Sequence, residues 1–251
     1  MIRRLREGGP WQLICLPFAG GTADMYRPLA AAMSPEWEVA AIEAPGRGGV
    51  PGPPLSDFDK LAAAQERAVV AAARRPYVLF GHSLGGALAF RIAQRLAGSA
   101  RSPAAIALSG CRPPGSPDLP VPRSTASDGE LIDFLRRVGG TDDRLLADPE
   151  FLSYALPLLR SDLRAGETLV FQDHSALALP AVLLAGTSDD VVPPAVMEGW
   201  RIYLPLASVH EIRGGHMFVV TAPTATAAPL RALARDAARE GPTLMESEEA
   251  P

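Results

Sequence analysis

The fold is decided by residues 77–93, which read YVLFGHSLGGALAFRIA. An apolar run with strand propensity, Tyr77–Phe80, leads into Gly-His-Ser-Leu-Gly, and a run with helical spacing of apolar residues follows. This matches the G-x-S-x-G pattern, in which a sharp turn from strand to helix exposes a serine hydroxyl. Glycines are needed on both sides because the backbones come too close for a Cβ atom. The alternative is a tight turn in an inert glycine-rich loop. The flanking strand and helix favour a nucleophilic Ser83.

Short apolar runs alternate with longer segments of helical periodicity on both sides of this unit. That alternation is typical of an α/β fold with a mostly parallel central sheet. The strand runs lack alternating polar residues, so we expect helices on both faces of the sheet. The expected strands are 11–17, 39–42, 77–81, 104–109, 181–186 and 209–212, and the expected helices are 25–33, 61–74, 85–96, 196–203 and 224–239.

One region breaks the alternation. After a proline-rich stretch, two amphipathic helices are expected at 128–138 and 149–164 with no strand between them. Such an insertion is most simply a lid over the carboxyl edge of the sheet, where ligands bind in folds of this class. The alternative is a helical hairpin packed at the side. We expect residues 1–240 to form a single domain with a lid insertion at about 112–170, and the acidic tail 241–251 to be disordered.

The composition and net charge of the chain argue against several classes of function. The chain has 251 residues, of which 47% are apolar and 21% charged, and its formal net charge is −4. Binding to nucleic acid or to a membrane surface needs clustered cations, so neither is expected. No apolar run reaches the roughly 18 residues that span a bilayer, and no secretory signal is present, which predicts a cytoplasmic protein. Cys15 and Cys111 are expected to be buried free thiols.

A serine nucleophile needs a base, and in this fold class the chain order is serine, acid, histidine. The chain has four histidines. His82 lies inside the serine turn and His174 precedes every suitable acid, so neither is a candidate. His210 lies within an expected strand, whereas His216 follows a glycine pair just past that strand, where a loop can reach Ser83. We expect His216 to be the base and keep His210 as the weaker alternative.

The orienting acid is expected in the loop 186–193, which follows the strand at 181–186. Asp189 and Asp190 both lie there, and the spacing from the start of the loop favours Asp189. Asp190 would then be a solvated turn residue. A metal site built on this aspartate pair is disfavoured because no ligand cluster lies near it in sequence.

Acyl transfer also needs two N–H donors aimed at the oxyanion of the tetrahedral intermediate. One should come from Leu84, the residue after the nucleophile. The other should come from the glycine-rich loop after the first expected strand, with Ala19 or Phe18 as the donor.

Taken together, these segments resemble the type II thioesterases, stand-alone α/β-hydrolases that work beside polyketide synthases and nonribosomal peptide synthetases. The resemblance runs from about residue 11 to residue 233 and includes the lid around 156–162. It rests on Leu-Pro-Phe-Ala-Gly-Gly at 16–21, Ala-Pro-Gly-Arg-Gly at 44–48, Gly-His-Ser-Leu-Gly at 81–85, Gly-Thr-Ser-Asp at 186–189 and Gly-Gly-His-Met-Phe at 214–218. Departures from the family pattern occur at Phe18 and at 49–51, which abut the family's substrate entrance.

The resemblance implies an α/β-hydrolase fold with Ser83 as nucleophile, Asp189 as acid, His216 as base, and the N–H groups of Ala19 and Leu84 as the oxyanion hole. It also implies hydrolysis of acyl thioesters held on the phosphopantetheine arm of a carrier protein. We expect a monomer that has no cofactor or metal of its own. The competing readings are a carboxylesterase or lipase acting on small free esters, and a binding protein without activity. Four arginines of the lid are expected to meet the acidic carrier surface, or else to form a solvated helix face: Arg136, Arg137, Arg144 and Arg160.

Overall fold

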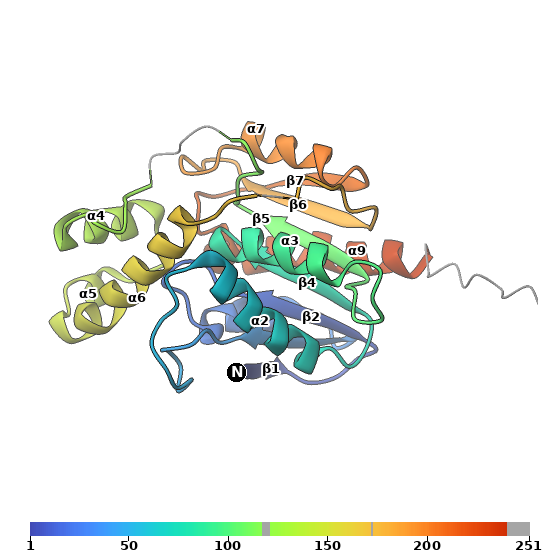
Figure 1. Ribbon diagram of the computed structural model, residues 1–251, viewed down its shortest axis with the longest axis horizontal. Coiled ribbons are helices and arrows are strands. Elements are labelled where there is room, and N and C mark those ends of the chain that lie inside the picture. Colours follow the sequence, from blue (N-terminus) through green and yellow to red (C-terminus); the bar gives the residue numbers. More distant parts are fainter. Residues whose placement is uncertain (117–120, 172, 240–251) are drawn as a thin grey trace, which may run out of the picture.

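The computed structural model describes residues 1–116, 121–171 and 173–239, so the tail 241–251 lies outside the described residues. A central sheet runs through the molecule with strand order β1-β3-β2-β4-β5-β6-β7 (Figure 1). The strands are β1 (Ile2–Arg6), β2 (Trp11–Leu16), β3 (Trp37–Ile42), β4 (Tyr77–His82), β5 (Ala105–Ser109), β6 (Ala181–Gly186) and β7 (Ala207–Ile212). All neighbouring strands pair in parallel except β1, which runs antiparallel to β3. The mostly parallel sheet expected from the sequence is confirmed.

Strand β1 was not predicted. Three of its five residues are arginines, so it carries no apolar run, and it forms an edge of the sheet with its side chains only partly buried. Charged side chains are common on edge strands because they discourage pairing with another chain. The strand is therefore defined by its pairing with β3 rather than by its own composition.

Helices cover both faces of the sheet, as the strand composition predicts. In Figure 1, α2 and α3 lie in front of the sheet and α9 lies behind it. The helices outside the segment between β5 and β6 are η1 (Ala23–Tyr26), α1 (Arg27–Ala32), α2 (Phe58–Ala72), α3 (Leu84–Leu96), α7 (Pro194–Met197), η2 (Glu198–Ile202), α8 (Phe218–Thr221) and α9 (Pro223–Arg239), of which η1 and η2 are 3₁₀ turns.

Between β5 and β6 the chain forms α4 (Asp128–Val138), α5 (Asp143–Leu146) and α6 (Pro149–Glu167), which project together beyond one end of the sheet (Figure 1). Helix α4 begins at a capping box in which Ser127 and Glu130 bond to each other's backbone N–H groups. Helix α5 was not predicted, since four residues carry no periodicity. A small apolar cluster of Leu131, Leu156 and Leu159 joins α4 to α6.

The core is one large apolar cluster that includes the strands and the inner faces of the helices. Cys15 and Cys111 are free and buried in it, as expected, and burial raises the pKa of both thiols far above the ordinary value. None of the helices in the described ranges combines the length and the apolar character needed to cross a membrane.

Candidate active site

Ser83 stands on a strained turn between β4 and α3. Its φ of +53° makes it the one non-glycine residue with positive φ among the described residues. The glycines around it are required by space: a Cβ on Gly81 would lie 1.9 Å from the Gly85 carbonyl oxygen, and a Cβ on Gly85 would lie 2.4 Å from that of Leu16. The Ser83 N–H donates to the Ser109 carbonyl oxygen at 2.8 Å. The close backbone packing and this hydrogen bond together hold the turn in place, so Ser83 keeps its strained backbone conformation.

A chain of hydrogen bonds leads from Ser83 into the protein. His216 Nε2 lies 3.3 Å from Ser83 Oγ, and His216 Nδ1 lies 2.8 Å from Asp189 Oδ2. The other oxygen of Asp189 accepts the N–H groups of Val191 and Val192 at 2.9 and 2.8 Å. Because an ionised carboxylate only accepts, Nδ1 carries the imidazole proton and Nε2 offers its lone pair to the serine. His216 and Asp189 are only 5% and 4% exposed, which shields this arrangement from water.

The weaker alternatives lie outside that chain. The Asp190 side chain is 58% exposed and faces Arg137 at 3.9 Å. His210 is exposed on β7, and its Nε2 lies 3.2 Å from the Ser208 hydroxyl. His174 lies near the Tyr203 hydroxyl instead. In the part of the chain that the structure describes, no three His, Cys, Asp or Glu side chains are grouped so that they could hold a metal ion.

His82 packs against His216, a contact that was not predicted from the sequence. Its ring centroid lies 4.9 Å from that of His216, and its Nδ1 lies 2.9 Å from the Ser109 hydroxyl. Phe18 and Phe218 pack edge-on against the same ring. Burial, and secondly the proximity of His216, lower the pKa of His82 well below its ordinary 6.5. His82 is therefore neutral at physiological pH and adds no positive charge beside the His216 ring. Its position as the last residue of β4, next to Ser83, is the signal that could have found it.

Both expected oxyanion donors are free to act on a substrate. Leu84 is the first residue of α3, so its N–H has no acceptor within the helix. Ala19 occupies a turn at 18–21 that is closed by the Gly21 N–H, which donates to the Phe18 carbonyl oxygen at 2.9 Å. Within the described residues, neither N–H donates to a protein acceptor. Ala19 and Leu84 line one cavity with Ser83.

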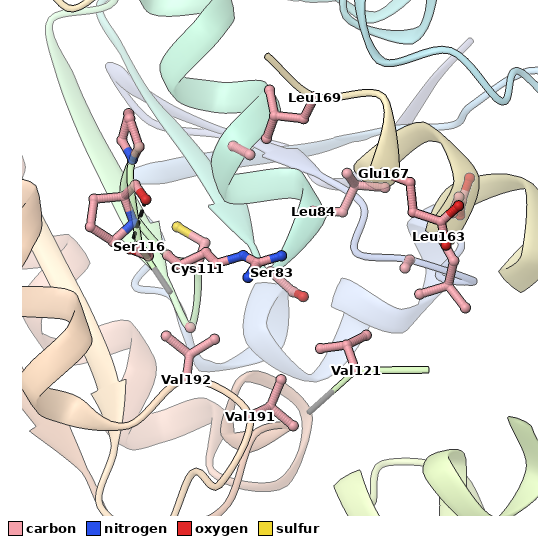
Figure 2. A pocket seen from close by; sticks show the side chains of 18 of the residues that line it. Ser83, Leu84, Cys111, Ser116, Val121, Leu163, Glu167, Leu169, Val191 and Val192 are labelled. Atoms are coloured by element: carbon pink, nitrogen blue, oxygen red, sulfur yellow. Dashed lines mark hydrogen bonds between the residues drawn. The ribbon is translucent and has the colours of Figure 1, made fainter. Parts of the chain in front are cut away.

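Two cavities meet at Ser83, and residues of α6 line both of them. The first has a volume of about 450 Å³ and mixed polarity. Figure 2 shows Leu163 and Glu167 of α6 on one side of it, Val191 and Val192 on another, and Ser83 between them. The second has a volume of about 300 Å³ and is mainly apolar. It is lined among others by Phe18, Met25, Phe134, Leu158, His216 and Met217. A substrate with two chemically different halves can therefore be placed across the serine.

The sequence matches the thioesterase domain family over residues 11–233. The chain belongs to this family. It is 34% identical over 216 residues to a probable cadicidin biosynthesis thioesterase of Streptomyces griseus, an alignment that covers 85% of this chain and 59% of that relative. It is 35% identical over 211 residues to thioesterase TesA of Mycobacterium marinum, with 82% and 84% of the two chains covered.

Among solved structures, the thioesterase is similar to BorB, a type II thioesterase from the borrelidin biosynthetic cluster. The two superpose with a TM-score of 0.82 at 33% identity, and the match covers 92% of this chain and 96% of BorB. These matches confirm the α/β-hydrolase fold and the resemblance to type II thioesterases inferred from the sequence.

Proposed function

We propose that this thioesterase hydrolyses acyl groups from the phosphopantetheine arm of a carrier protein and so unloads a polyketide or nonribosomal peptide synthase. The observation that carries the proposal is the hydrogen-bonded chain from Asp189 through His216 to Ser83, which ends where two cavities meet. The relatives reported above are named as thioesterases, which favours thioesters over free oxygen esters as substrates.

The proposed mechanism uses only groups of this chain. His216 Nε2 takes the proton of Ser83 as the hydroxyl oxygen attacks the thioester carbonyl. The N–H groups of Ala19 and Leu84 bind the resulting oxyanion. A thiol has a pKa of about 8.5, so the pantetheine sulfur leaves with little assistance. His216 gives the serine proton to the departing sulfur, which leaves as a free thiol, and the imidazole is neutral again. The neutral His216 then takes a proton from a water as the water oxygen attacks the acyl-serine carbonyl, and return of that proton to Ser83 Oγ releases the carboxylic acid and restores the serine. Neither a cofactor nor a metal enters these steps.

The different polarity of the two cavities supports a placement for each half of the substrate. The apolar cavity, with Phe134 of α4 and Leu158 of α6 in its wall, suits the acyl chain because burying apolar surface is favourable. The mixed cavity, with Arg112 and Glu167 in its wall, suits the amide-rich pantetheine arm. The thioester carbonyl is then held at Ser83, between the two.

The expected docking role of the lid arginines is weakened by their contacts. Arg160 donates to Asp128 at 2.5 Å within the lid. Arg136 lies 2.8 Å from Asp133, and Arg137 lies 3.9 Å from Asp190. Arg144 is exposed and has no ion pair with a described residue, so it is the better candidate. If Arg144 meets an acidic carrier, Arg144→Glu lowers kcat/KM for acyl-carrier substrate and leaves free acyl-pantetheine unaffected. Equal kcat/KM on both substrates would remove Arg144 from the proposal.

The proposal is tested by comparing kcat/KM for an acyl-pantetheine thioester with that for the oxygen ester of the same acyl group. We expect the thioester to be preferred by about tenfold or more. The Ser83→Ala variant is the control, and it should keep the fold and lose both activities. A preference for the oxygen ester would favour the carboxylesterase reading instead.

A further inference from the structure

A buried ion pair connects the lid to the loop that follows β3. The guanidinium of Arg47 bonds both carboxylate oxygens of Asp162, with Nη1 to Oδ2 and Nη2 to Oδ1 each at 2.6 Å. Both residues are only 3% exposed, and Asp162 lies on α6 of the lid. Because a buried ion pair loses its hydration, it is often no more stabilising than apolar residues of the same size. Fold stability is thus a weak explanation for this pair.

The same two side chains also hold the turn at 18–21. Asp162 Oδ2 accepts the Gly20 N–H at 2.7 Å, and Arg47 Nη1 donates to the Gly21 carbonyl oxygen at 3.1 Å. Helix α6 also meets the turn through apolar contact, since Ala19 packs against the cluster that contains Leu156 and Leu159. Gly20 has a φ of +72°, the left-handed conformation that a turn of this shape requires at its third residue.

These contacts determine where the Ala19 N–H points. The peptide before Ala19 is fixed because the Phe18 carbonyl oxygen accepts the Gly21 N–H across the turn. The peptide after Ala19 is fixed because its N–H, that of Gly20, is bound by Asp162. Peptide units are planar, so holding both of them sets the two backbone dihedrals of Ala19. Without an acceptor for the Gly20 N–H, the second peptide loses the side-chain contact that fixes its orientation within the turn.

We propose that Asp162 is a positioning residue that shapes the oxyanion hole from the lid, and that Arg47 holds its carboxylate in place. The inference rests on the proposed function, in which Ala19 supplies one of the two donors. Its consequence is that α6 belongs to the catalytic arrangement. If α6 moved away from the turn, Ser83 and His216 would remain paired, but the Ala19 donor would lose its fixed direction. Hydrolysis would then proceed only with the lid seated on the turn.

Two double variants test this role. Arg47→Met with Asp162→Asn removes both charges but keeps an amide oxygen for the Gly20 N–H. Arg47→Met with Asp162→Leu removes both charges and that acceptor. Complete loss of one oxyanion donor costs about 10²- to 10³-fold in kcat, so a misdirected donor is expected to cost about 10- to 100-fold. We therefore expect kcat of the leucine variant to be lower than that of the asparagine variant by this factor, with KM within about threefold.

Thermal unfolding of both variants separates positioning from folding. Asp128→Asn is the matched control, since it breaks another lid ion pair, with Arg160, that does not touch the turn. It should leave kcat unchanged. Should the leucine variant not fold, Arg47→Met with Asp162→Ala takes its place. Equal kcat in the two folded double variants would overturn the inference. A wild-type protein that does not hydrolyse acyl-pantetheine thioesters would instead overturn the proposed function.

Discussion

Replacing Asp189 by asparagine tests the hydrogen-bonded chain at its buried end. Asp189 Oδ1 accepts two backbone N–H groups, and Oδ2 accepts the His216 Nδ1 proton. An asparagine has one oxygen and one NH₂ group. Its oxygen is required by the two backbone donors, so its NH₂ group must face His216. The imidazole then accepts at Nδ1 and carries its proton at Nε2, where it cannot take a proton from Ser83.

The size of the effect follows from those contacts. Turning the amide to restore the productive tautomer would leave the N–H groups of Val191 and Val192 without an acceptor. Each buried donor left unsatisfied costs about 1–3 kcal/mol, so the turned amide is disfavoured by about 2–6 kcal/mol. At 1.36 kcal/mol per factor of ten, this lowers the productive population by about 30- to 10⁴-fold. Loss of the charge that stabilises the imidazolium adds to this, so we expect kcat to fall by at least about 10²-fold.

The assay is release of free thiol from a short acyl-pantetheine thioester, with thermal unfolding recorded on the same samples. Asp190→Asn is the matched control because Asp190 is the adjacent, exposed carboxylate. It should leave kcat within about twofold of wild type. The reasoning is refuted if Asp189→Asn keeps more than a third of the wild-type kcat, or if the two variants lose activity equally.

Two further predictions concern stability. Gly85→Ala would place a Cβ atom 2.4 Å from a backbone carbonyl oxygen, so we expect a loss of more than about 3 kcal/mol in chemical denaturation, and a loss below 1 kcal/mol would contradict the packing of the turn. The second prediction concerns Glu43, which is only 2% exposed. One of its carboxylate oxygens accepts the Ala23 N–H, and the other has no hydrogen-bond partner in the described residues. Burial raises the pKa of this carboxyl group above the usual 4.5. The folded state therefore binds this proton more tightly than the unfolded state, and stability is lost as pH rises from 4.5 through the raised value. Glu43→Gln keeps the acceptor without ionising, so its melting temperature relative to wild type should rise between about pH 4.5 and pH 8, and a constant difference would contradict the account.

Each site residue could be predicted because the sequence next to it shows a recognisable strand, turn or loop. Ser83 is flanked by glycines between a strand and a helix, and His216 and Asp189 follow strands whose carboxyl ends lie at one edge of the sheet. Because parallel strands end together, positions far apart in the chain could be expected to meet. The structure brings these three side chains into hydrogen-bonding contact, and their catalytic roles remain a proposal.

The features that could not be predicted are contacts between segments far apart in the chain, which leave no local sequence pattern. Arg47 and Asp162 are separated by 115 residues, and nothing in either segment indicates that their side chains meet. The antiparallel pairing of β1 with β3 could not be predicted either, because three of the five residues of β1 are arginines and the segment has no apolar strand pattern. The contact of His82 with His216 arises only once β4 and the loop after β7 are folded together.

The most direct test of the account is the mass of the protein shortly after mixing with an acyl carrier protein. We expect a covalent acyl adduct that maps to Ser83 by peptide fragmentation, that decays as free acid appears, and that is absent from Ser83→Ala. An adduct on another residue, or release of free acid by Ser83→Ala at the wild-type rate, would contradict it.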